Sequence, residues 1–140
     1  MRRLILLLAL LLCGAATTRA QVRFVEGTTD DLRRLAIEQQ KLVFIDLTAT
    51  WCGYCRLMDS EVFSTKEAGD YINAHFIAAR YDVDKPTGRA LMRRYEARGV
   101  PYCLVFDTEG NLLGRIGGAC NTERLIKHLQ RIVAQSKMPK

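Results

Sequence analysis

Two cysteines separated by two residues form the part of this sequence best suited to chemistry. Cys52 and Cys55 stand in the run Trp51-Cys52-Gly53-Tyr54-Cys55, between an apolar segment and a helical pattern. A cysteine in the first turn of a helix meets unpaired N–H groups and the positive end of the helix dipole, which stabilise a thiolate. Lowering a thiol pKa from about 8.5 to about 7 takes roughly 2 kcal/mol, so we expect the Cys55 thiol to add a hydrogen bond. The spacing predicts Cys52 as a nucleophile towards a substrate disulfide and Cys55 as the resolving thiol.

Two other uses of this pair compete with redox exchange. A purely structural disulfide closing a four-residue loop would contribute only about 2 kcal/mol, against roughly 3 kcal/mol for a fifteen-residue loop. A zinc site needs a second pair of ligands. Cys103 and Cys120 stand 17 positions apart, and His75 and His128 are isolated from the cysteines. We therefore expect no metal and no cofactor, and zinc binding stays as an alternative to be tested.

The elements that must hold the cysteines alternate between apolar runs and helical periodicity. Strands are predicted at 22–25, 42–45, 76–83, 102–106 and 112–116, the last two joined by a hairpin loop at 107–111. Helices are predicted after Thr28, after Cys52, after a capping box Ser64-x-x-Glu67, before Gly99 as the C′ residue, and from about Asn121. Strands separated by helices imply parallel crossovers, and the final hairpin adds antiparallel strands. The expected fold is α/β, a central mixed sheet with helices on both faces.

The N-terminus has the pattern of a secretory signal. Two arginines precede an apolar run from Leu4 to Leu12, which is followed by small and polar residues to Ala20. The run is too short for the roughly 20 residues of a membrane-spanning helix. Cleavage after Ala20 or after Ala16 fits equally well, and lipidation of Cys13 fits poorly because Leu12 precedes it. We expect residues 1–20 to be a signal peptide, residues 21–140 to be one domain, and the location to be periplasmic or otherwise extracytoplasmic.

Removing residues 1–20 would lower the net charge of the chain. The 140-residue chain has 21 basic and 15 acidic side chains, a net charge of +6. Three of the basic residues lie in the first 20 positions and no acidic residue does, so the net charge falls to +3. A cluster of arginines at 89, 93, 94 and 98 has the spacing of a solvated helix face without interleaved aromatic residues. We expect no nucleic-acid partner.

These residues together resemble the thioredoxin family over essentially all of residues 21–140. The likeness rests on Asp46 six positions before Cys52, on the run from Trp51 to Cys55, on Gly99-Val100-Pro101, on Gly110, and on Gly117-Gly118. The resemblance implies the thioredoxin fold and a cis proline at Pro101 lying against the cysteine pair. The backbone of Val100 would then pair with the substrate chain.

The same resemblance assigns roles to polar residues near the pair. Asp46 matches the family's buried proton acceptor for the resolving cysteine, and a carboxylate inside an apolar run needs a partner or neutralisation. Arg80 takes the place of a lysine that assists this aspartate in thioredoxin, and arginine keeps its charge. Trp51 either packs beside the loop or contacts substrate. Cys103 is expected to be a buried small hydrophobe, while an exposed Cys120 or a 103–120 disulfide is left open.

Two details bear on the direction of electron flow. Cys-Gly-Tyr-Cys resembles the motif of periplasmic disulfide isomerases, which carry a separate dimerisation domain for which we expect no room here. Residues 55–64 instead resemble the C-terminal thioredoxin-like domain of the membrane thiol:disulfide interchange reductase. We expect a monomeric thiol-disulfide oxidoreductase that reduces protein disulfides and is recharged by a membrane or soluble thiol donor. Alternatives are a disulfide oxidase or isomerase, a non-catalytic binding module, and a zinc module.

Overall fold

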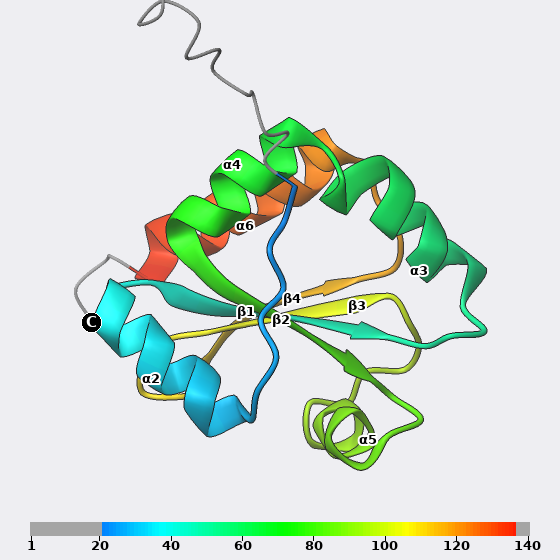
Figure 1. The fold of residues 1–140 in the computed structure, drawn as a ribbon, viewed down its shortest axis with the longest axis horizontal. Helices are drawn as coiled ribbons and strands as arrows, with labels where there is room; N and C mark the ends of the chain where they lie inside the picture. Colours follow the sequence, from blue (N-terminus) through cyan, green and yellow to red (C-terminus); the bar gives the residue numbers. More distant parts are fainter. Residues whose placement is uncertain (1–20, 137–140) are drawn as a thin grey trace, which may run out of the picture.

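The computed structural model describes residues 21–136 and contains one four-stranded sheet between two layers of helices (Figure 1). The predicted signal peptide lies outside the described residues. In chain order the elements are α2 (Thr29–Gln39), β1 (Leu42–Thr48), α3 (Gly53–Met58), η1 (Asp59–Phe63, a π-helix), α4 (Lys66–His75), β2 (Phe76–Asp82), α5 (Pro86–Arg94), β3 (Tyr102–Phe106), β4 (Leu112–Gly117) and α6 (Thr122–Ser136). Within 21–136, no helix is long and apolar enough to cross a bilayer.

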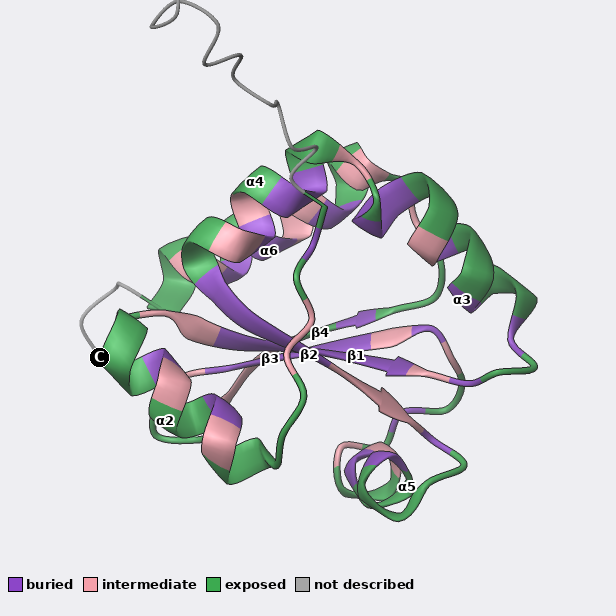
Figure 2. Cartoon of the chain, viewed as in Figure 1, coloured by how far each residue is buried: buried purple, intermediate pink, exposed green. Residues whose placement is uncertain are grey.

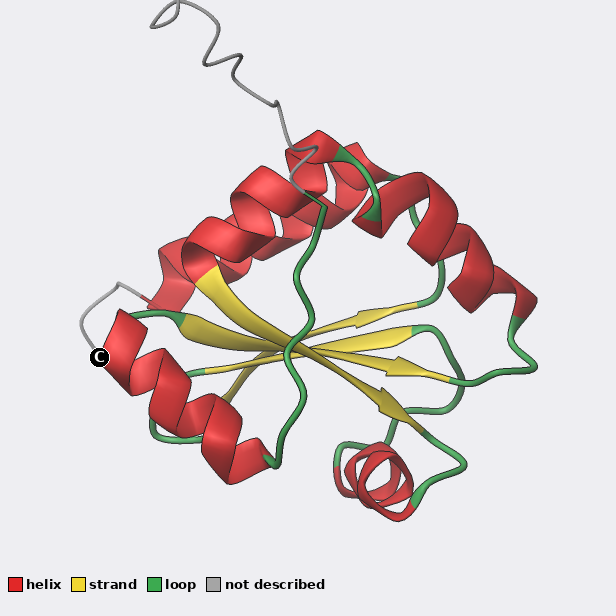
Figure 3. Cartoon of the chain, in the orientation of Figure 1, coloured by secondary structure: helices red, strands yellow, loops and turns green. Residues whose placement is uncertain are grey.

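The sheet is mixed, as the sequence predicts. Its strand order is β2-β1-β3-β4, with β1 parallel to β2 and antiparallel to β3, and β3 antiparallel to β4. Helices α4 and α6 cover one face, and α2 and α5 cover the other (Figure 3). The α/β architecture and the helices on both faces are therefore confirmed.

Strand β1 is the centre of the molecule and is buried on both faces. Side chains alternate along a strand, so Phe44 joins the core beneath α4 and α6, whereas Val43, Ile45 and Leu47 join the core beneath α2 and α5. Figure 2 shows the strands as largely buried and the outer faces of the helices as exposed. By the same alternation, the side chain of Asp46 projects on the Phe44 side of the sheet.

Three sequence predictions need correction. The strand expected at 22–25 is reduced to a single parallel bridge between Phe24 and Ala78, so this segment runs beside β2 without a ladder. Helix α4 is capped by Thr65, whose Oγ1 accepts the N–H of Ala68, and not by Ser64. Helix α5 ends at Arg94, before the expected stop at Gly99. The chain turns at Glu96, which has a left-handed φ of 54°.

One close approach between elements gives a test of this packing. A Cβ at position 88 in α5 would lie 2.1 Å from the backbone oxygen of Asp82, so any side chain in place of Gly88 must push α5 away from the end of β2. We expect Gly88→Ala to lower the free energy of unfolding by about 1 to 3 kcal/mol, the usual range for overpacking. Chemical denaturation measures the change. Gly99→Ala is the control, because a methyl group there would meet nothing within 4 Å; equal stability of the two variants would contradict the packing.

Candidate active site

The cysteine pair lies where β1 leads into α3. Cys52 is the N-cap residue of α3 and forms a disulfide with Cys55. The Sγ of Cys52 accepts the backbone N–H of Cys55 at 3.1 Å. Both cysteines are 4 % exposed. The sulfur of Cys52 thus lies at the positive end of a helix, in the environment that favours its thiolate once the disulfide is reduced.

The residues beside the pair differ sharply in exposure. Val100 packs against the core cluster that contains both cysteines, and the Val100–Pro101 peptide bond is cis, as the resemblance implies. Trp51 is 65 % exposed, and its Nε1–H donates to Oδ2 of Asp84 at 2.9 Å. Tyr54, between the two cysteines, is 68 % exposed. The disulfide is therefore buried but bordered by aromatic side chains that face solvent.

Within residues 21–136, Asp46 is the one charged or polar residue that is buried, 2 % exposed. Its Oδ2 accepts from Nε of Arg80 at 2.9 Å, and the Sγ of Cys103 lies 4.0 Å from its Oδ1, at the long end of a sulfur hydrogen bond. Cys103 is the antiparallel register partner of Asp46, and Arg80 is its parallel partner, so both contacts come from the sheet. The aspartate is held from the two neighbouring strands.

Arg80 connects this buried carboxyl group to the surface. Its Nη2 also donates to Oδ1 of Asp59 in η1, and its guanidinium lies 4.2 Å from the centroid of the Phe24 ring. The side chain of Asp46 is 3 % exposed, that of Arg80 29 %, and that of Asp59 43 %. One positive charge is therefore shared between two carboxylates along a path from the core to solvent.

This environment sets the protonation of Asp46. Burial raises its pKa from 3.8 to about 6; the charge and hydrogen bond of Arg80 act in the opposite direction, and the charge of Asp59 adds to the rise. At neutral pH the carboxyl group is mostly ionised, yet it can take up a proton at a small free-energy cost. Such a group is suited to accept a proton during thiol chemistry.

The spacing of the sequence did not identify Asp59 or the contact of Cys103 with Asp46. Asp59 stands four residues after Cys55, one helical turn along the same helical run, which is the available signal for a side chain near the pair. The link between Asp46 and Cys103 depends on strand register and had no local signal. Within residues 21–136, His, Cys, Asp and Glu side chains do not gather in groups of three or more able to hold a metal ion.

The two remaining cysteines of the described chain have different environments. Cys103 is buried, and burial, followed by the charge of Asp46, raises the pKa of its thiol well above the usual value. Cys120 is half-buried in the segment between β4 and α6. Burial also raises the pKa of Cys120, and Arg124 acts against that rise. The thiol of Cys103 is thus both less accessible and harder to ionise.

These environments predict the pattern of chemical labelling. With the Cys52–Cys55 disulfide intact, we expect iodoacetamide to label Cys120 in the folded protein at least about tenfold faster than Cys103, because only a thiolate with access to solvent reacts. Mass spectrometry of the digested protein measures each site separately. In denaturant the two rates should converge. Equal labelling in the folded protein would contradict the burial of Cys103.

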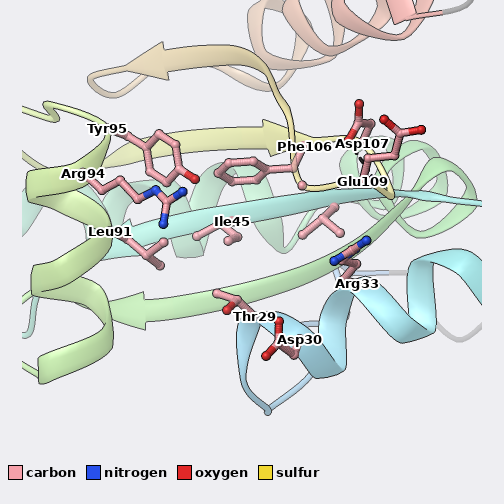
Figure 4. Close-up of a pocket in the computed structure, with 12 residues that line it drawn as sticks. Thr29, Asp30, Arg33, Ile45, Leu91, Arg94, Tyr95, Phe106, Asp107 and Glu109 are labelled. Atoms are coloured by element: carbon pink, nitrogen blue, oxygen red, sulfur yellow. Dashed lines mark hydrogen bonds between the residues drawn. The ribbon is translucent and has the colours of Figure 1, made fainter.

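A hollow lies between α2 and α5, on the face of the sheet opposite to the side chain of Asp46. It has a volume of about 280 Å³, with Ile45 and Phe106 among its apolar lining residues and charged side chains from both helices. Figure 4 shows Arg94 of α5 on one side and Arg33 near the turn that follows β3. Arg33 is already engaged, since its Nε donates to the backbone oxygen of Thr108 at 2.6 Å. This hollow has no cysteine in its lining.

Comparison with known proteins agrees with this geometry. The thioredoxin-like domain family matches residues 29–132. Over 119 residues the chain is 31% identical to thiol:disulfide interchange protein DsbD of Cronobacter sakazakii, a match covering 81% of this chain but only 21% of that protein. The chain thus spans about a fifth of that relative's length.

One further relative and one solved structure match most of the chain. The chain is 35% identical over 96 residues to thioredoxin H5 of Arabidopsis thaliana, covering 66% of this chain and 75% of that protein. A solved structure of a putative disulphide-isomerase from Bacteroides thetaiotaomicron superimposes with a TM-score of 0.74 at 29% sequence identity, covering 81% of this chain and 94% of that one. Together with the cysteine pair at the start of α3, these matches show that the chain belongs to the thioredoxin-like family of disulfide oxidoreductases.

Proposed function

We propose that this protein reduces protein disulfides outside the cytoplasm by dithiol–disulfide exchange through Cys52 and Cys55. The observation that carries the proposal is the position of Cys52 as the N-cap of α3, in a disulfide with Cys55. The disulfide state is the oxidised product of such a reaction. Its reduced form would hold the two electrons to be passed on.

The exchange has two balanced steps. The Cys52 thiolate attacks one sulfur of the substrate disulfide; a new S–S bond joins Cys52 to the substrate, and the other substrate sulfur leaves as a thiolate that takes up a proton. Cys55 then loses its proton and attacks Sγ of Cys52. The Cys52–Cys55 disulfide forms, the mixed disulfide breaks, and the substrate leaves as a dithiol that has gained two electrons.

Asp46 is the proposed acceptor of the Cys55 proton. A pKa of about 6 lets the carboxylate take the proton at neutral pH and release it afterwards. Val100 and Pro101 form the proposed platform for the substrate backbone, and the exposed ring of Trp51, the residue before Cys52, would offer the substrate an apolar contact. The Trp51–Asp84 hydrogen bond would hold that ring in place.

The reducing direction is supported by similarity to the interchange protein DsbD, and it can be measured directly. We expect the Cys52–Cys55 couple, equilibrated with glutathione buffers, to have a reduction potential of about −270 mV, as for thioredoxin. A potential of about −120 mV, typical of a strong oxidant, would overturn the reducing assignment.

An isomerase is the second candidate. It is favoured by the exposed Tyr54 within the cysteine pair and by the likeness to the structure of a putative disulphide-isomerase. Recovery of activity from scrambled ribonuclease separates the two functions. An isomerase restores activity without net electron transfer, whereas a reductase consumes one dithiol donor for each disulfide opened.

The location and partners are also part of the proposal. Residues 1–20 would direct export and be removed, and oxidised proteins would be the substrates of a monomer recharged by a membrane or soluble thiol donor. The protein would need no cofactor and no nucleic acid. N-terminal sequencing of the protein after expression in a Gram-negative host tests export: a start at Gln21 or Thr17 is expected. An uncleaved N-terminus retained in the cytoplasm would contradict the proposal.

A further inference from the structure

A groove of about 410 Å³ runs along the helix that begins at the redox pair. One wall is made by α3 and η1, and the other by the segment that joins β4 to α6. Tyr54, Leu57 and Met58 line it on the helical side, and Cys120 lines the opposite side. The backbone N–H of Cys120 donates to Sδ of Met58 at 3.4 Å, which fixes the two walls together.

The end of the groove nearest the cysteines is apolar and open to water. Tyr54 is 68 % exposed and Leu57 is 43 % exposed. Apolar side chains in a hollow next to a reactive centre gain free energy when a partner covers them. This end therefore fits an apolar side chain close to the reacting sulfur of the partner.

The other end of the groove is acidic. Glu61 of η1 and Glu123 in the first turn of α6 are its charged lining residues, and both are exposed. The Oγ1 of Thr122 donates to the backbone oxygen of Glu61 at 3.5 Å, which places the two turns side by side. In the described chain neither glutamate takes part in a salt bridge. Two carboxylates on facing walls favour a positive charge between them.

The distance between the two ends sets the spacing of a ligand. Glu61 follows Tyr54 by seven residues, which is roughly 10 Å along a helix at about 1.5 Å per residue. An extended chain covers that distance in about three residues. The groove thus matches a strand-like peptide whose cationic side chain stands about three positions from the cysteine that reacts.

We propose that this groove selects the polypeptide substrate: an extended segment with an apolar residue beside its disulfide cysteine and a lysine or arginine about three residues away. The inference rests on the proposed function of the redox pair and adds a sequence preference to it. Arg124 lies near Cys120 but does not line the groove. The preference runs against the long-range field, because residues 21–140 carry a net positive charge, which alone would favour acidic substrates.

Two disulfide-linked peptides test the preference. Both peptides carry a leucine next to the cysteine. One has a lysine three positions before and three positions after that cysteine, and the other has a glutamate at the same two positions. We expect kcat/KM for reduction of the lysine peptide to exceed that of the glutamate peptide by about five- to tenfold at low salt, and the ratio to shrink at high salt as charges are screened. A ratio of one, or faster reduction of the glutamate peptide, would overturn the proposal that the groove selects cationic substrates.

Substitutions assign the preference to these residues. The double variant Glu61→Gln with Glu123→Gln is expected to bring the ratio close to one. Glu38→Gln is the matched control, since this exposed glutamate lies in α2 on the opposite face of the sheet, and it should leave the ratio intact. A ratio retained in the double variant, or lost equally in the control, overturns the assignment.

Blocking the groove gives an independent readout. Alkylation of Cys120 with N-ethylmaleimide, made while Cys52 and Cys55 are disulfide-bonded, should lower kcat/KM for the lysine peptide at least fivefold after reduction. The reagent should have no effect on Cys120→Ser, and an unchanged rate in the alkylated protein speaks against the groove. Hydroxyethyl disulfide is a small neutral substrate that does not need the groove, so it distinguishes a failure of the proposed function from a failure of the proposed groove. Failure to reduce it would sink the proposed function, whereas its reduction without any peptide preference would sink only the groove.

Discussion

Cys52→Ser is expected to reduce insulin disulfides at least about 1000-fold more slowly than the wild-type protein with the same dithiol donor, a loss comparable to removing the nucleophile from other covalent catalysts. The physical reason is local. The sulfur at position 52 caps α3 and accepts the N–H of Cys55, so the helix end stabilises an anion there. A serine hydroxyl at the same position stays protonated and offers no exchangeable sulfur.

Cys55→Ser is the matched control and should fail in a different way. Cys52 can still attack, but the mixed disulfide has no resolving thiol, so the variant should accumulate covalently bound substrate. Mass spectrometry without reductant detects that adduct. The assignment fails if Cys52→Ser retains turnover, or if the adduct forms on Cys52→Ser and not on Cys55→Ser.

The sequence predicted those parts of the fold in which local pattern and tertiary contacts agree. Strand β3 occupies the predicted residues 102–106, and α6 begins at Thr122, because an apolar run or stripe with clear turn residues leaves one way to bury it. The segment 22–25 has a strand-like composition but forms one bridge. It lies beyond β2, where a further ladder would have to form on the edge of the sheet.

The site was predictable to the extent that it is local. The spacing of Cys52 and Cys55 and their place at a helix start follow from the sequence alone. The surroundings of Asp46 depend on register: Arg80 and Cys103 face it only because β2 and β3 pair with β1 at those positions. Asp59 begins the π-helix that follows α3, and its contact with Arg80 of β2 joins residues 21 positions apart, a pairing for which the sequence has no local pattern.

Asp46→Asn is expected to raise the free energy of unfolding at neutral pH and to lower the rate of disulfide reduction. The pKa of Asp46 is about 6 in the folded protein, against 3.8 for an ordinary aspartate, a difference worth about 3 kcal/mol at about 1.36 kcal/mol per pH unit. Because the folded state binds the proton more tightly, this group costs no stability below about pH 4. Its penalty develops as pH rises from about 4 to 6 and is complete above that range.

The difference in unfolding free energy between Asp46→Asn and the wild-type protein should therefore depend on pH. At pH 3, Asp46→Asn and the wild-type protein should unfold at similar denaturant concentrations; at pH 8, the variant should be more stable by about 2 to 3 kcal/mol. Reduction of insulin by the variant should fall about 10- to 100-fold at pH 7, the usual range for loss of a proton acceptor. A stability difference independent of pH, or a faster variant, would contradict the role of Asp46.

Asp59→Asn removes one charge from the group formed by Asp46, Arg80 and Asp59 while keeping a side chain of nearly the same shape. The charge of Asp59 contributes to the raised pKa of Asp46, and Arg80 is shared between the two carboxylates. With Asp59 neutral, the guanidinium serves Asp46 alone, so the pKa of Asp46 in the folded protein should fall. Its stability penalty should then be smaller at pH 8 and complete at a lower pH, while the penalty still begins at about pH 4, the pKa of the unfolded chain. Activity at pH 7 should decline less than in Asp46→Asn, because the acceptor remains and only its proton affinity changes. If the pH dependence of stability is the same as in the wild-type protein, the charge of Asp59 does not raise the pKa of Asp46, which is then set by burial and by Arg80.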